Sequence, residues 1–129
     1  MTPISDAEAM VMEVLWAGSP RSAEDVIGAL ADATGWAEPT IKTLLNRLLN
    51  KGAIDACRDG RRYLYSPVLQ REAWVQQQSE GLLARLFGGR VAPLVAHFSE
   101  RGRLSASDIA ELKRLVAELD DGREPGDGR

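Results

Sequence analysis

The sequence of 129 residues is poor in cysteine and histidine, with one residue of each type. A disulfide framework needs paired cysteines, and a structural zinc site built from Cys and His needs about four ligands. Both are therefore excluded within a single chain. We expect neither a bound metal nor another cofactor.

Long apolar runs are also missing. No stretch approaches the roughly 20 apolar residues that cross a bilayer. The start, MTPISDAEAM, is acidic, whereas a secretion signal opens with basic residues. We therefore expect a cytoplasmic protein without direct membrane insertion. The length predicts one domain, or a small domain with an appendage.

Features that would support catalysis are scarce. His97 lies in an apolar run, and no Ser, Cys or Asp has a base at the spacing of a catalytic triad. Gly88-Gly89 lacks the preceding strand and the following lysine of a phosphate-binding loop. Cys57, in a predicted strand, is more simply a structural or incidental cysteine than a reactive one. The chain is not expected to be an enzyme.

Capping signals predict where the first two helices begin. Ser5 with Glu8, and Ser22 with Asp25, have the spacing of capping boxes. The apolar periodicity of the first helix predicts one buried stripe, made of Met10, Val11, Val14 and Leu15.

The third helix has the clearest boundaries, because Pro39 suits the first helical position and Gly52 suits a C-terminal stop. Its core face is predicted to be formed by Ile41, Leu44, Leu45 and Leu48. At about 100° per residue, the opposite face carries polar side chains, with a lysine on either side. These are Lys42, Thr43, Asn46, Arg47, Asn50 and Lys51.

A hairpin is predicted next, because Asp59-Gly60 separates two β-prone runs and Pro67 ends the second. Basic residues gather over this helix and hairpin. Thr40 to Arg71 contains seven basic and two acidic residues, a balance of +5, so the remainder of the chain, whose total is −3, carries −8. Net charge alone would argue against nucleic-acid binding, but its distribution argues for it.

A polar helix followed by an Arg-tipped hairpin is typical of a winged helix-turn-helix. Short polar side chains reach base edges in the major groove, and Arg58, Arg61 and Arg62 would reach phosphates or the minor groove. The plainer alternative is a solvated helix face. A second alternative is a winged-helix protein-interaction module that docks an acidic protein surface, although such a module has no need for three arginines at a hairpin turn.

The remaining chain is predicted to form helices from Gln70 to about Phe87 and from Val91 to Phe98. A last helix is predicted to begin at the capping signal formed by Ser105 and Asp108. These helices carry more apolar surface than a small appendage can bury. We expect a homodimer, because pairing doubles the DNA contacts of one winged helix; the alternative is that the helices fold back on the first domain. The predicted dimerisation residues are Trp74, Leu82, Leu86, Ile109, Leu112, Val116 and Leu119.

The fold class predicted from these patterns is mainly α with a small β-hairpin, a winged helix-turn-helix followed by a C-terminal helical dimerisation region. The predicted domains are a winged-helix DNA-binding domain over 1–70, a helical dimerisation domain over 71–120 and a disordered tail over 121–129.

Three segments together resemble the penicillinase-repressor family of bacterial transcription regulators. The resemblance covers about Ile4 to Leu119. The segments are ISDAEAMVMEVLW, GWAEPTIKTLLNRLLNKGAID and LVAHFSERGRLSASDIAELKRLV. The matching motif positions, in the family's order and spacing, are Trp36, Thr40, Thr43, Leu44, Arg47, Leu48, Lys51, Gly52, Leu104 and Ser105.

The resemblance implies a cytoplasmic homodimer that represses transcription by occupying a palindromic operator overlapping a promoter. It implies operator reading by Thr40, Lys42 and Thr43, and support of DNA-backbone contacts by Arg47 and Lys51. Its wing positions are Arg61, Arg62 and Tyr63, and the residue pattern adds Asn46 and Arg58 to the candidate DNA-binding set. Lys42 stands where β-lactam-responsive members usually have Arg, and lysine lacks arginine's bidentate fork.

Two departures concern the inducing signal. In β-lactam-responsive members, a membrane-bound metalloprotease sensor leads to cleavage at an Asn-Phe bond; the matching bond here is His97-Phe98, which counts against this mode of release. Proteolytic control through a membrane sensor therefore stays a weaker hypothesis. The copper-responsive branch uses paired C-terminal cysteines, which this chain lacks, so direct copper sensing is not expected.

Overall fold

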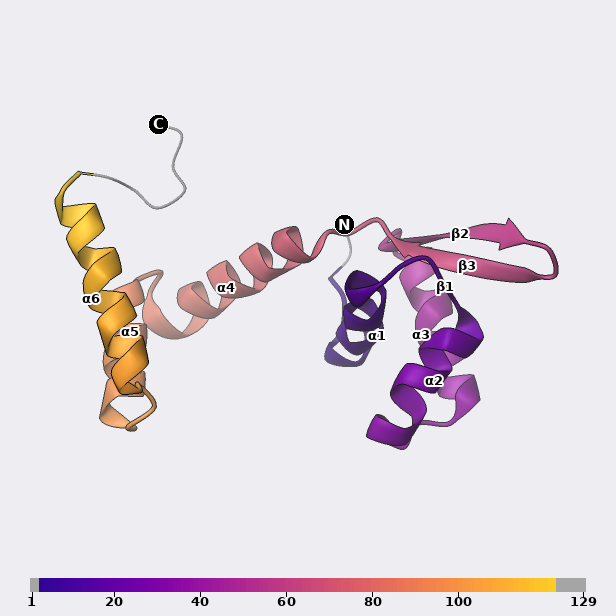
Figure 1. Ribbon diagram of the computed structural model, residues 1–129, viewed down its shortest axis with the longest axis horizontal. Coiled ribbons are helices and arrows are strands. Elements are labelled where there is room, and N and C mark those ends of the chain that lie inside the picture. Colours follow the sequence, from indigo (N-terminus) through magenta and orange to yellow (C-terminus); the bar gives the residue numbers. More distant parts are fainter. Residues whose placement is uncertain (1–2, 123–129) are drawn as a thin grey trace. The chain divides into compact units, whose positions relative to one another are not determined.

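The computed structural model describes residues 3–122 (Figure 1). Contacts divide the chain into two compact units, Met1–Gln77 and Gln78–Arg129. The predicted fold class is confirmed, because the described chain is mainly helical with one small antiparallel sheet. In this described part, no helix is both long enough and apolar enough to span a bilayer.

The first unit contains three helices, α1 (Asp6–Ala17), α2 (Ala23–Thr34) and α3 (Glu38–Asn50). Both predicted capping boxes are confirmed: the Ser5 hydroxyl accepts from the Glu8 N–H, and the Ser22 hydroxyl accepts from the Asp25 N–H. Pro39, predicted as the first residue of α3, is its second, because the helix begins at Glu38.

The sheet of this unit has three strands in the order β1-β3-β2, where β2 is Ile54–Asp59 and β3 is Arg62–Pro67. The predicted hairpin is therefore confirmed. The third strand, β1 (Arg21–Ser22), pairs with β3 and was not predicted. Two residues are too few to show the alternation by which a strand is recognised in sequence.

The core of the first unit is built where α1, α2 and α3 meet the sheet. All four predicted core residues of α3 are buried. The predicted stripe on α1 was partly wrong: Met10 is 42% exposed, whereas Met12 is fully buried. The buried face of α1 runs through Glu8, Val11, Met12 and Leu15, and the position of the sheet and α3 selects this face. Val14, also predicted for the stripe, packs only partly against the core.

Helix α4 (Arg71–Phe87) begins in the first unit and ends in the second, which also contains α5 (Val91–Glu100) and α6 (Ala106–Asp120). The predicted capping box of Ser105 with Asp108 is confirmed. After α4 the chain turns at Gly88 and Gly89, whose φ values of 58° and 77° suit glycine. No residue of these three helices is buried within the described chain. The tail predicted to be disordered lies, from residue 123, outside the described residues.

Candidate nucleic-acid interface

The candidate interface begins with the outward face of α3. Because Ile41, Leu44, Leu45 and Leu48 fix the inner face, the polar residues between them point to solvent. All of the predicted α3 contact residues except Lys51 are exposed, namely Thr40, Lys42, Thr43, Asn46 and Arg47, together with Asn50. Their hydroxyl, amide and cationic groups match the donors and acceptors on base edges and phosphates.

The cations of this face are available for a partner. The Lys42 ammonium lies 3.4 Å from the Glu38 carboxylate one turn earlier, but both side chains are more than half exposed. Such a surface ion pair contributes about 0–1 kcal/mol, so a phosphate or base can replace it at low cost. The Arg47 guanidinium has no hydrogen-bond or ion-pair partner within the described residues.

The hairpin arginines differ in what holds them. Arg58 donates to the Gly60 carbonyl at 3.0 Å, and its guanidinium lies 5.8 Å from the Tyr63 ring centroid. The Arg62 guanidinium lies 3.4 Å from the Asp59 carboxylate. Arg61, at the turn, has no such contact among the described residues. The wing therefore presents Arg61 as its uncommitted cation.

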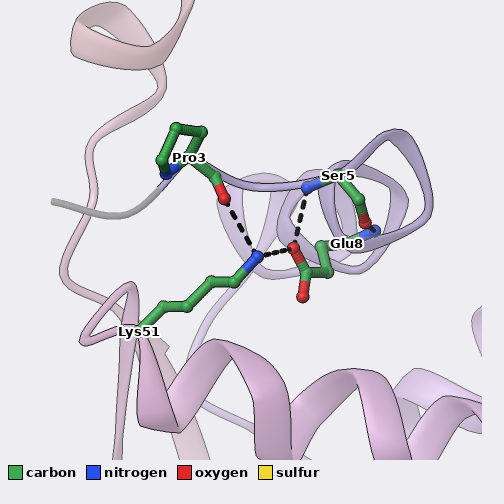
Figure 2. Close-up of polar contacts among 4 residues, drawn as sticks. All are labelled: Pro3, Ser5, Glu8 and Lys51. Carbon is green, nitrogen blue, oxygen red and sulfur yellow. Dashed lines mark hydrogen bonds and ion pairs between the residues drawn. The ribbon is translucent and has the colours of Figure 1, made fainter.

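Lys51 is the member of the predicted set that the structure places differently (Figure 2). Its ammonium contacts the Glu8 carboxylate at 2.5 Å and donates to the Pro3 carbonyl at 2.9 Å. Glu8 also accepts from the Ser5 N–H at 2.7 Å. The sequence assigned Glu8 only a capping role, since nothing local to the first helix indicates a lysine 43 positions later.

Burial acts to raise the pKa of Glu8, but hydrogen bonds from Lys51 and Ser5 outweigh it. The pKa of this carboxyl therefore lies below its ordinary value. Glu8 is thus a carboxylate at neutral pH, matched by an ammonium. This pair holds the beginning of α1 to the end of α3.

Two residues at the beginning of α4 also have partners inside the first unit. The Arg71 guanidinium donates to both oxygens of Glu13, at 2.9 and 3.3 Å. Trp74, predicted for dimerisation, packs against Trp16, with ring centroids 5.4 Å apart. This contact favours the fold-back alternative for Trp74, and its role in dimerisation stays a prediction.

The other predicted dimerisation residues lie in the second unit, on α4 and α6, and are exposed or half-buried. Leu86 and Val116 are 64% and 54% exposed, and Leu82, Ile109 and Leu119 are exposed too. Leu112 is half-buried and lines an apolar groove of about 660 Å³ between α5 and α6. This groove also contains Val91, Val95, Leu115, Val116 and Leu119.

The bond considered for cleavage, His97-Phe98, lies inside α5, and both side chains are exposed. The two rings are in edge contact, with centroids 5.3 Å apart, and the Phe87 ring centroid lies 6.1 Å from that of His97. Among the described residues, no three His, Cys, Asp or Glu side chains are grouped as a metal site would need.

Comparison with known proteins places the chain in one family. The model of the family described as "Penicillinase repressor" matches residues 4–118. The penicillinase repressor of Bacillus licheniformis is 35% identical over 115 residues, covering 89% of this chain and 90% of that protein. The methicillin resistance regulatory protein MecI of Mammaliicoccus sciuri is 30% identical over 113 residues, covering 88% and 92%.

A solved structure agrees with these relatives. It is the Bacillus licheniformis repressor BlaI, in its monomeric form, in complex with the blaP half-operator. It has 38% sequence identity and a TM-score of 0.50, and the match covers 56% of this chain and 88% of that one. The relatives are repressors, in agreement with the expectation that this chain is not an enzyme. The chain belongs to the penicillinase repressor family of transcriptional regulators.

Proposed function

We propose that this protein is a cytoplasmic, homodimeric repressor that occupies a palindromic DNA operator. The observation that carries DNA binding is the exposed polar face of α3, beside which the same unit presents an arginine-tipped wing. The BlaI structure that is 38% identical to this chain is in complex with a half-operator, which supports DNA binding here.

The proposed contacts divide into two kinds. Thr40, Lys42, Thr43 and Asn46 read base edges in the major groove, where side chains of these types discriminate bases. Arg47, at the later end of the helix, and Arg61, at the wing, contact phosphates and fix the register. The other predicted wing residues stabilise the hairpin itself. Arg58 pairs with Tyr63 across the two strands and donates to the turn, and Arg62 contacts Asp59.

Homodimer formation is proposed from the second unit. None of its helical residues is fully buried among the described residues, and the apolar groove between α5 and α6 is open. An exposed apolar patch of this kind marks an interaction surface. A second copy is the proposed occupant, since two joined winged helices read both halves of a palindrome at once.

DNA binding is tested with a duplex enriched from a random library by the full-length protein. Fluorescence anisotropy should give an affinity for this duplex that falls linearly with the logarithm of the salt concentration, and a weaker affinity for a scrambled duplex. Absence of a salt slope, or equal binding to both duplexes, would refute operator recognition. A protein-interaction module would instead bind neither duplex.

The manner of release is a separate hypothesis. Cleavage at His97-Phe98 by a membrane-bound metalloprotease sensor would divide the second unit and reduce the avidity of the dimer. The bond lies in a helix, so cleavage first requires local unwinding of α5. Co-expression with a sensor encoded nearby, followed by mass spectrometry of the repressor after induction, tests this idea. An intact chain in derepressed cells would dismiss it.

A further inference from the structure

The contact between Glu8 and Lys51 has an unusual setting. Glu8 is 1% exposed, and no other ionisable residue in the described part of the chain is buried. A buried carboxylate is costly unless it is paired and hydrogen-bonded. Here one oxygen accepts from both the Ser5 N–H and the Lys51 ammonium, and this ammonium also donates to Pro3 (Figure 2). All of these partners come from the beginning of α1 or the end of α3.

The pair adds a polar contact to the apolar packing between α1 and α3. Met12 and Leu15 of α1 belong to the same core cluster as Leu45 and Leu48 of α3. Apolar burial is non-directional, so it tolerates small rotations and translations of one helix against another. A charge-assisted hydrogen bond requires a defined distance and angle. The ion pair therefore adds the directional contact at this end.

The same contact determines what Lys51 can do. Its N–H donates to the Arg47 carbonyl as the C-terminal cap of α3, so Lys51 is attached to the helix turn that presents Arg47. Its ammonium, however, points into the protein toward Glu8, and moving it to a phosphate would leave a buried carboxylate without its cation. In the protein without DNA, the Lys51 ammonium is thus already bound to Glu8.

We propose that Glu8 is a positioning residue for operator recognition: through Lys51 it fixes the C-terminal end of α3, and Lys51 acts within the protein instead of contacting a phosphate. The inference rests on the proposed function in so far as α3 reads DNA. It assigns Lys51 a different role from the one implied by family resemblance, and it gives Glu8 a role beyond capping.

The test uses full-length Glu8→Gln, Lys51→Met and the double variant, each checked for folding by circular dichroism. Gln at position 8 keeps an oxygen that can accept from Ser5, so α1 remains capped. We expect each single variant to weaken binding of the library-selected duplex by at least about threefold, and the double variant to be no weaker than the single ones. Affinity for the scrambled duplex should fall less. The slope of log affinity against log salt should match that of the unmodified protein.

Two outcomes would overturn the proposal. One is that Lys51→Met reduces the slope of log affinity against log salt by about 0.9, while Glu8→Gln leaves binding unchanged or tightens it. Lys51 then contacts a phosphate. If both folded variants bind the selected duplex like the unmodified protein, the pair contributes to stability alone.

A second measurement does not depend on DNA. In the free protein, amide hydrogen exchange at Lys51, Gly52 and Ala53, which cap α3, should be faster in both single variants, while exchange in α2 is unchanged. Unchanged exchange at the end of α3 would refute positioning by Glu8. If the unmodified protein bound no duplex, the proposed function would fail while this measurement still decided the role of the pair.

Discussion

The indole rings of Trp16 and Trp74 pack at 5.4 Å between centroids, inclined by 39°, and join α1 to the beginning of α4. Their N–H groups have different fates. The Trp16 indole N–H donates to the Leu69 carbonyl at 2.8 Å, whereas the buried indole N–H of Trp74 has no hydrogen-bond partner among residues 3–122. The two residues therefore form a natural pair for separating packing from hydrogen bonding.

Trp16→Phe should lower the free energy of unfolding by about 1–2 kcal/mol, because it removes a hydrogen bond and leaves the Leu69 carbonyl unsatisfied. Trp74→Phe is the matched control. It removes a similar ring volume and an indole N–H without a partner in the described part of the chain, so its loss of unfolding free energy should be smaller. Urea unfolding measures both. Equal losses would mean that ring packing, not the hydrogen bond, dominates at this junction.

Arg61→Ala should weaken binding to every duplex and reduce the slope of log affinity against log salt by about 0.9, the value for one phosphate contact. The reason is that Arg61 is the uncommitted arginine of the wing. Arg71→Ala removes the same charge, but from a guanidinium bound to Glu13 on α1, and should leave the slope unchanged. Anisotropy titrations at several salt concentrations measure both. Equal slopes for the two variants would contradict the wing assignment.

Lys42→Ala should weaken binding to the selected duplex by about 1–3 kcal/mol and relax the protein's sequence preference at one position, as expected for loss of a base-edge contact. Arg103→Ala, in the segment between α5 and α6, serves as the control for loss of one positive charge. Affinities for a set of single-base variants of the duplex give the measurement. A uniform loss across the whole set would identify Lys42 as a phosphate contact.

Val116→Glu should convert a dimer into a monomer, because it places a charge in the apolar groove between α5 and α6. Affinity for a duplex with both half-sites should then fall by about 100-fold through lost avidity, with little change for a single half-site. Ala110→Glu adds the same charge to an exposed position of α6 outside that groove. Analytical ultracentrifugation reports the oligomeric state. A Val116→Glu dimer would place the interface elsewhere.

Acidification should reduce the contribution of Glu8 to stability. Because the pKa of Glu8 in the folded protein is below its ordinary value of 4.5, its contribution is complete above that value and is lost as pH falls through the lower, folded value. The difference in unfolding free energy between unmodified protein and Glu8→Gln should therefore shrink from about pH 5 downward. Urea unfolding over this range measures it, with Glu24→Gln as the control for an exposed carboxylate. A difference that does not vary with pH would contradict the ionised pair.

Most of the local structure could be predicted because its causes lie within a few residues. Ser22 and Asp25 form a capping box wherever the helix is placed, and Asp59-Gly60 turns the chain whatever packs on the hairpin. The periodicity of α3 likewise fixed which residues face inward. Helix ends, the wing and the polar face of α3 were therefore accessible from sequence.

The tertiary structure decided which of several chemically similar residues have partners. It buried Met12 and exposed Met10, added β1 to the hairpin and placed Trp74 on Trp16. It also separated the cations, since Lys51 is held by Glu8 whereas Arg61 is free within the described residues. Sequence alone determined where the basic residues gather. It could not tell which of them are available to a partner, because Lys51 and Glu8 are 43 positions apart and meet only when α1 packs on α3.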